Sequence, residues 1–301
     1  FTGSERFSKT RPPFRRVKYQ ITSGCDMLKR TFTAIVGVTA AFFLIRSGGL
    51  IFAAAVLLLA IIGWHEFRVM MLSKGYKVYY LTSGTAVALL NIVPALGYKD
   101  TLVPILTAAI ISIMLEGLYY HKRGNWAPEV ALSSFSVLYV GLLFSHFTML
   151  REVSLSVVNV TGMGSMPLGE VFLWLVLFGT WASDTFAYIF GCAFGKRPLC
   201  QAVSPKKSIE GAIAGFLGCI LVVVYLGTYL LAFDFIKTFS LSILIAIFAP
   251  LGDLVESLLK RSFGVKDSGK VFPGHGGVLD RFDSVLFAIP ITYYFILYIF
   301  L

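Results

Sequence analysis

The amino-acid sequence predicts an all-α membrane protein, a polytopic bundle of transmembrane helices. Of its 301 residues, 57% are hydrophobic and only 14% are charged, whereas a soluble domain carries about 25% charged residues. The mean hydropathy is +0.79. Several apolar runs approach the ~20 residues that a spanning helix needs, and they lack the alternation of a transmembrane β-strand. These observations exclude a water-soluble domain and a β-barrel.

About nine apolar runs are candidate spans. They cover residues 28–45, 50–67, 78–96, 102–120, 130–150, 171–194, 209–233, 239–259 and 284–301. The long segment 151–170 between the fifth and sixth spans has a soft, mixed composition. It predicts a connector, with a short re-entrant or surface helix as the alternative.

The basic residues predict the orientation of the bundle. With the N-terminus in the cytoplasm, 22 of the 26 Lys and Arg residues fall in cytoplasmic segments, and only Arg46, Lys99, Arg151 and Lys237 fall outside. This bias is the positive-inside signal. It explains the net charge of +10 without a nucleic-acid partner. It also places two polar segments, 196–208 and 257–283, on the side where nucleotides are found.

Residues 1–26 form a polar, basic segment apart from the spans. Pro12-Pro13 and the lack of apolar periodicity argue against a folded unit, and Met27 followed by Leu-Lys-Arg resembles a natural start before the first span. We therefore predict a disordered extension over 1–26 and a transmembrane catalytic domain over 27–301 with its active site facing the cytoplasm. Deletion of the extension should leave activity intact.

Ionisable residues at membrane depth are costly and indicate function by default. Asp184 lies deep in the sixth span, with Tyr188 one helical turn further on. We expect both to line a site; the alternative is a packing seam of small residues in which Asp184 bonds to a neighbouring helix. Glu66 and Glu116 lie near the cytoplasmic ends of their spans, where their side chains can reach water, so a structural role is favoured for both.

The end of the eighth span carries a polar stripe. Asp253, Glu256, Ser257 and Lys260 stand at i, i+3, i+4 and i+7, so they share one face of a helix. That face points toward the polar segment that follows. We expect it to line the site.

The segment Ser257–Asp283 is a polar island between two apolar runs. Asp280 and Asp283 face the same way if the last helix has already begun, and with Asp253 they offer three hard oxygen donors suited to Mg²⁺ or Mn²⁺. Pro273–Gly277 provides a backbone that can approach a ligand closely. His275 could be a ligand, an acid or a phosphate hydrogen-bond donor, and the sequence does not choose among these roles.

A second basic cluster occupies the facing cytoplasmic loop, at Lys196, Arg197, Lys206 and Lys207. A solvated loop that obeys the positive-inside rule is the alternative, although the stretch Ser204–Gly211 is more particular than that rule requires. Two glycines before Lys196 mimic a P-loop, but the spacing is GxxxGK and the motif follows a helix rather than a strand. We reject that match.

These residues resemble the signature of the phosphatidate cytidylyltransferases, or CDP-diacylglycerol synthases. The signature appears here without a departure as Ser257, Lys260-Arg261, Lys266-Asp267, Gly269, Pro273, His275-Gly276-Gly277 and Asp280-Arg281-Phe282-Asp283. The helix of Asp184 and the stretch Ser204–Gly211 look like other recurring segments of that family. The resemblance covers residues 27–301.

The resemblance implies transfer of a cytidylyl group from CTP to phosphatidic acid, with release of pyrophosphate, in the phospholipid biosynthesis of a bacterial cytoplasmic membrane. It implies Mg²⁺ on Asp253, Asp280 and Asp283, with Mn²⁺ as a substitute and a second cation such as K⁺ left open. The phosphate of phosphatidic acid is already ionised near neutral pH, so no general base is required. The site must position two polyanions and neutralise charge at the α-phosphorus and the leaving group.

We expect the remaining residues to serve substrate contacts. The catalytic set comprises Lys260, Arg261, Lys266 and Arg281 on phosphates, together with Asp267 and His275. The substrate-binding set comprises Ser204, Lys206 and Lys207 on the facing loop, Gly274, Gly276 and Gly277 at the nucleotide end, Asp184 and Tyr188 in a cavity opening toward lipid, and Ser257.

Three other functions are compatible with parts of the sequence. A cation-coupled transporter would also place acids in the membrane, but no internal repeat is evident and the charge lies at one face. Another membrane phosphotransferase is the nearest rival, although the Asp-Gly-x-x-Ala-Arg pattern of the CDP-alcohol phosphotransferases is absent. A structural scaffold would not need the island.

A homodimer stays open, because the Gly211-x-x-x-Gly215 seam could pack within or between chains.

Overall fold

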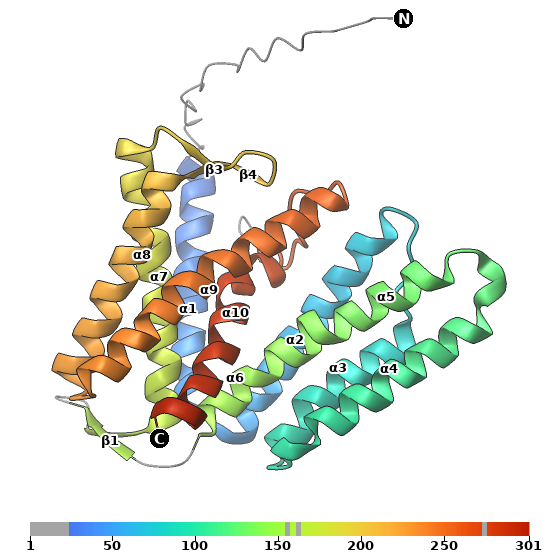
Figure 1. Ribbon diagram of the computed structural model, residues 1–301, viewed down its shortest axis with the longest axis horizontal. Helices are drawn as coiled ribbons and strands as arrows, with labels where there is room; N and C mark the ends of the chain where they lie inside the picture. Colours follow the sequence, from blue (N-terminus) through green and yellow to red (C-terminus); the bar gives the residue numbers. More distant parts are fainter. Residues whose placement is uncertain (1–23, 154–156, 161–163, 273–275, 301) are drawn as a thin grey trace, which may run out of the picture.

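The computed structural model describes residues 24–153, 157–160, 164–272 and 276–300. Within these residues the chain is almost entirely helical (Figure 1). The α-helices are α1 (Gly24–Ser47), α2 (Gly49–Leu72), α3 (Tyr80–Ala95), α4 (Leu102–Tyr119), α5 (Trp126–Ser136), α6 (Leu143–Arg151), α7 (Leu168–Phe194), α8 (Ile209–Val224), α9 (Phe235–Ser262) and α10 (Leu279–Phe295). Short 3₁₀ turns cover Lys99–Thr101 and His121–Arg123, and π-helical turns cover Val137–Leu142, Tyr225–Leu230 and Ile296–Phe300.

The lengths of the helices confirm the predicted membrane bundle. In the described part of the chain, seven helices are long and apolar enough to cross a membrane: Gly49–Leu72, Lys99–Tyr119, Trp126–Arg151, Leu168–Phe194, Ile209–Leu230, Phe235–Ser262 and Leu279–Phe300. The predicted spans 28–45 and 78–96 correspond to shorter apolar helices, Ile35–Ser47 within α1 and Tyr80–Ala95. At 1.5 Å per residue the latter is about 24 Å long, less than the ~30 Å of a hydrocarbon core.

The helices form two groups that meet along α6 and α10. Helices α2 to α5 lie on one side, and α1 with α7 to α9 lies on the other (Figure 1). Helix α6 continues α5 through the π-helical turn and packs against α2 and α3 as well as α7 and α10. Helix α10 packs mainly on α9. Residues far apart in the sequence therefore meet at the ends of this central pair.

Small residues allow α7 and α8 to pack closely. A Cβ atom on Gly211 would lie 2.7 Å from the carbonyl oxygen of Ala187, and one on Gly215 would lie 2.7 Å from that of Ser183. Any larger side chain would push the helices apart, as in other small-residue membrane seams. This Gly-x-x-x-Gly seam therefore packs within one chain.

Within the described residues, two antiparallel strand pairs interrupt the helices. Strands β1 (Val157–Val160) and β2 (Gly164–Pro167) pair antiparallel in the connector before α7. The connector prediction for this segment is confirmed. Its described residues 157–160 and 164–167 form strands rather than the alternative helix, and the strands satisfy their backbone groups by pairing with each other. Strands β3 (Pro198–Cys200) and β4 (Ser204–Ser208) pair between α7 and α8.

A cluster of charged residues, Arg46, Arg151 and Glu170, lies where α1 and α6 end and α7 begins. We call it the distal charge cluster, because α7 runs from it over 27 residues to the opposite end of the bundle. Glu170 is 1% exposed and Arg151 is 7% exposed. Arg151 donates to Glu170 at 3.3 Å and to the carbonyl of Ile45 at 2.7 Å, while Arg46 donates to Glu170 at 3.4 Å.

Candidate active site

A polar cavity of about 320 Å³ opens where α7, α9 and α10 converge. Its lining residues are Asp184, Asp253, Lys260, Asp267, Asp280, Arg281, Asp283 and Ser284. Seven of these eight residues are predicted site residues, and Ser284 was not predicted. Within the described residues, this is the place where the predicted carboxylates and cations come together.

The polar stripe on α9 is confirmed as one face of a helix. Lys260 forms an ion pair with Glu256 one turn earlier, and the Ser257 hydroxyl donates to Asp253 at 3.3 Å. The helix extends to Ser262, so Lys260 and Arg261 lie on it rather than in the loop that follows. Arg261 is exposed on its last turn, outside the lining of the cavity.

Helix α10 begins at Leu279, so Asp280 and Asp283 lie on its first turns as the sequence analysis required. At Gly252 of α9, an added Cβ would collide with the backbone carbonyl of Asp283. This close approach of α9 and α10 places Asp253 next to Asp283 at the cavity wall.

Asp280 is held by an extensive set of hydrogen bonds. Its Oδ2 accepts from the backbone N–H groups of Ser268 and Gly277, both at 2.8 Å, and lies 2.9 Å from the Ser268 hydroxyl. Its Oδ1 accepts from Lys260 at 2.6 Å. Gly276 has a φ of +85°, and a Cβ on it would lie 2.5 Å from Asp280 Oδ2. Only glycine combines that backbone with this contact.

The hairpin of β3 and β4 reaches the cavity through one lysine. Lys207 forms an ion pair with Asp253, whereas Lys206, its neighbour on β4, is exposed. Successive side chains of a strand point to opposite faces, which explains the difference. Ser208 caps α8 by accepting from Gly211 N at 3.1 Å, and Glu210 accepts from Lys196 N at 3.1 Å. The stretch Ser204–Gly211 thus fixes the hairpin to the bundle.

The other predicted residues lie around the cavity rather than in it. Lys266 is exposed, and Tyr188 is exposed on α7 one turn beyond Asp184. Ser204 begins β4 and is half-buried, and Gly277 is buried beside Asp280. Gly274 and His275 lie outside the described residues.

A divalent cation such as Mg²⁺ prefers hard oxygen donors, and carboxylates line the cavity. Among the described residues, no three His, Cys, Asp or Glu side chains converge as a ready-made metal group. Mg²⁺, however, binds through one or two carboxylates together with substrate phosphates and water. Asp253 and Asp283 on the cavity wall fit that requirement in donor chemistry, while Asp280 would first have to release Lys260.

Two residues beside the cavity, Glu66 and Ser268, were not among the predicted site residues. Glu66 was expected to reach water from the end of its span, but it is 4% exposed and accepts hydrogen bonds from Ser268 and from the start of α10. Its buried position reflects the α10 segment packed over it. Ser268 is buried and contacts both Glu66 and Asp280. Gly269 and Gly277 leave room for the Glu66 side chain. These glycines were the sequence feature that could have indicated its burial.

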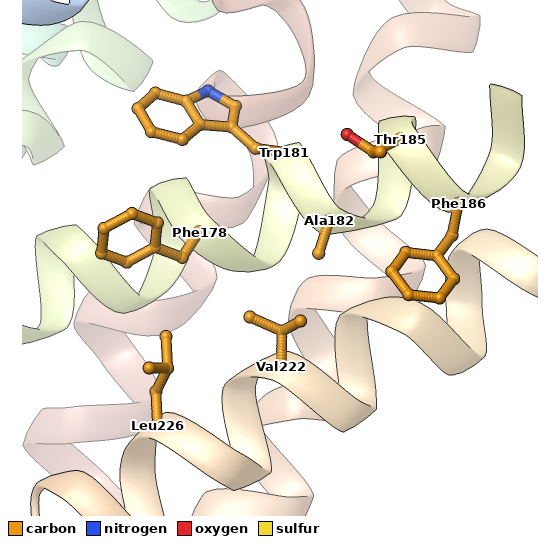
Figure 2. Close-up of a pocket in the computed structure, with 7 residues that line it drawn as sticks. All are labelled: Phe178, Trp181, Ala182, Thr185, Phe186, Val222 and Leu226. Carbon is orange, nitrogen blue, oxygen red and sulfur yellow. The ribbon is translucent and has the colours of Figure 1, made fainter. Parts of the chain in front are cut away.

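A second pocket, of about 330 Å³, is apolar and lies between α7 and the end of α8 (Figure 2). Its side chains are Phe178, Trp181, Ala182, Thr185, Phe186, Val222 and Leu226. The polar side-chain atoms of this lining belong to Trp181 and Thr185, and neither is charged, so the pocket has no charge with which to bind phosphate. It is a surface groove of a membrane helix pair, distinct from the polar cavity.

Comparison with known proteins gives the same assignment along most of the chain. Residues 28–299 match the Cytidylyltransferase family. A phosphatidate cytidylyltransferase of Staphylococcus epidermidis is 34% identical over 267 residues, covering 88% of this chain and 97% of the relative. One of Synechocystis sp. is 35% identical, covering 89% and 96%, and one of Staphylococcus aureus is 33% identical, covering 88% and 97%. The chain therefore belongs to the cytidylyltransferase family, as its signature residues indicated.

Proposed function

We propose that this protein transfers the cytidylyl group of CTP to phosphatidic acid, giving CDP-diacylglycerol and pyrophosphate. The relatives named phosphatidate cytidylyltransferase align with this chain over nearly their whole length. The observation that carries the proposal is the polar cavity, in which five aspartates, Lys260 and Arg281 gather at one end of an apolar bundle. A nucleotide needs the charges, and a diacyl lipid needs the apolar surroundings.

For this reaction the protein must position the two substrates and neutralise negative charge on their phosphates. An ionised oxygen of the lipid phosphate attacks the α-phosphorus of CTP, a new P–O bond forms, and the bond to the β-phosphate breaks as pyrophosphate leaves. Arg281 lines the cavity and Lys207 on the hairpin pairs with Asp253 beside it, so both would bind the phosphates. Arg261 and Lys266 on the exposed rim would attract the anionic substrates.

Lys207 and Lys260 already pair with aspartates at the site, through Asp253 and Asp280. Phosphate groups of a substrate would compete for these ammonium groups, so binding would exchange one partner for another. That exchange would free Asp253 and the Oδ1 atom of Asp280 in the same step. The carboxylates would become available when the substrate arrives.

Asp253, Asp280 and Asp283 would hold Mg²⁺, with Mn²⁺ as a substitute and room for a second cation such as K⁺. When bound, the ion would withdraw negative charge from the α-phosphate and the departing pyrophosphate. Asp184, on α7 across the cavity, would complete the wall on the side from which the lipid enters. We propose that this end of the bundle faces the cytoplasm, since the basic loops lie there.

Pyrophosphate release by detergent-purified protein tests the proposal. Protein given CTP and phosphatidic acid with Mg²⁺ should release pyrophosphate and form a CDP-lipid, and EDTA should abolish both. Omission of either substrate is the control. No release from a folded, lipid-supplemented sample would contradict the proposed reaction, and ion flux through proteoliposomes would then test the transporter alternative.

A further inference from the structure

Glu66 is a buried carboxylate that the proposed reaction does not use. It belongs to α2, in the group of helices away from α7 to α9. Removing a carboxylate from water is costly unless hydrogen-bond donors compensate. Within the described part of the chain, Glu66 accepts from Ser268, Val278 and Leu279. These donors belong to residues 268–272 and 276–279, the segment that leads into the active-site helix α10.

Glu66 acts as a helix cap supplied from a distance. Its Oε1 accepts from the backbone N–H of Val278 at 2.9 Å, and its Oε2 accepts from that of Leu279 at 3.1 Å. N–H groups at the start of a helix have no acceptor within the helix. Val278, at the N-cap position of α10, gives no side-chain cap. Glu66 therefore takes the place that Ser, Thr or Asp usually fills.

The same segment holds Asp280. The Ser268 hydroxyl lies 3.1 Å from Glu66 Oε2 and 2.9 Å from Asp280 Oδ2. The N–H groups of Ser268 and Gly277 both donate to Asp280. The two carboxylates thus hold the segment from opposite sides, with Glu66 in the bundle and Asp280 toward the cavity.

Steric fit supports the pairing of Glu66 with this segment. A Cβ on Gly269 would meet three Glu66 atoms and nothing nearer: Oε1, Cδ at 2.6 Å and Cγ at 2.9 Å. A Cβ on Gly277 would collide with Glu66 and Ser268. Neither Gly269 nor Gly277 has a positive φ, so close approach rather than backbone conformation accounts for glycine at both positions.

We propose that Glu66 is a positioning residue of the active site: it anchors residues 268–272 and 276–279, the segment described above, to α2 and so fixes Asp280 opposite Lys260. Its effect on turnover rests on the proposed function. Its effect on the anchoring of the segment does not, and the two can be measured separately.

Limited trypsin digestion measures the anchoring directly, because Lys266 and Lys270 beside the anchored residues are exposed. Glu66→Gln keeps the side-chain volume but turns an NH₂ group toward a backbone N–H donor. We expect cleavage between α9 and α10 to become about tenfold faster, since cleavage of native protein follows the equilibrium of local opening. Tenfold corresponds to about 1.4 kcal/mol.

Glu116→Gln is the matched control, because Glu116 is also a membrane glutamate but accepts from Thr82 at 2.6 Å, away from the segment. Its cleavage between α9 and α10 should match that of the wild type. Equal cleavage rates for Glu66→Gln and the wild type would overturn the proposal.

A double-mutant cycle tests the specific contact. Gly269→Ala should accelerate cleavage in the wild-type background, because its methyl group displaces Glu66. In a Glu66→Ala background it should add less than a twofold change, because coupled sites are not additive. Fully additive effects would contradict the anchoring, and Glu66→Gln decides the matter if Glu66→Ala does not fold.

Turnover supplies the functional test. Glu66→Gln should lower kcat about tenfold more than Glu116→Gln does, with the KM for CTP changed less than kcat. Unchanged kcat with faster cleavage would refute a role in positioning. Absence of turnover in the wild type would instead count against the proposed function, while the cleavage result would still decide whether Glu66 anchors the segment.

Discussion

The polar cavity and the distal charge cluster both bring charged side chains together, at opposite ends of the same bundle. In the distal charge cluster, Glu170 accepts from two arginines and Arg151 also donates to a backbone carbonyl. In the cavity, carboxylates from three helices line about 320 Å³ of space. The charges of the distal charge cluster are paired with one another, whereas those of the cavity line a space that a ligand can enter.

The difference separates structural from functional charge. A buried ion pair contributes little net stability, but removal of one partner leaves an uncompensated charge and is strongly destabilising. Charges that line a cavity are instead arranged for a charge that arrives with the substrate. Intramembrane charge alone therefore does not indicate a ligand site, whereas charge on the wall of a polar cavity makes that cavity the candidate.

The largest effect on activity should come from Asp283→Asn. Loss of one carboxylate at the cavity wall should lower turnover about 100- to 1000-fold, the range for a group that stabilises developing charge. Pyrophosphate release measures this, and the thermal unfolding temperature should change little. Asp100→Asn, an exposed aspartate elsewhere, is the control. Near-normal turnover of Asp283→Asn would remove it from the site.

The largest effect on stability should come from Arg151→Met in the distal charge cluster. Glu170 would lose its buried partner, at a cost of about 3–5 kcal/mol. Thermal unfolding in detergent should show a clear loss of stability, while turnover per folded molecule should stay close to that of the wild type. Replacement of both partners, Arg151→Met with Glu170→Leu, should recover part of the loss. A selective loss of turnover would contradict the structural role.

Lys207→Ala should have an intermediate effect. Its ammonium pairs with Asp253 in a partly exposed position, so loss of one charged contact to a substrate phosphate should raise a substrate KM about tenfold, consistent with ~1.5 kcal/mol for a charged hydrogen bond. Lys206→Ala is the matched comparison, because Lys206 points away from Asp253. Steady-state kinetics with each substrate varied in turn would measure both. Equal KM changes in the two variants would contradict the proposed strand geometry.

The smallest effect should come from Arg46→Gln. Arg46 contacts the same glutamate as Arg151 but is 49% exposed, and exposed ion pairs contribute about 1 kcal/mol or less. Thermal unfolding of Arg46→Gln and Arg151→Met under the same conditions compares the two. Similar losses in both would show that burial does not govern the stability of the cluster.

Much of the site was predictable because its residues are close in sequence or repeat at helical spacing. The stripe of Asp253, Ser257 and Lys260 follows from the period of a helix, and Asp280 with Asp283 follows from the start of the next one. Local geometry needs no knowledge of the rest of the chain. The connector 151–170 was harder, because the periodicity of a short apolar run does not distinguish a strand from a helix.

The contacts between distant segments were not predictable. The membrane bundle, its spans and the signature of the family follow from the sequence alone, since apolar length and local spacing determine them. Only the tertiary structure decided that Lys207 pairs with Asp253, that the Gly211 seam closes within the chain, and that Glu66 is buried under α10 rather than in water. Each of these contacts depends on how helices far apart in the sequence pack, and a carboxylate near the end of a span looks the same in sequence whether water or another helix lies beside it.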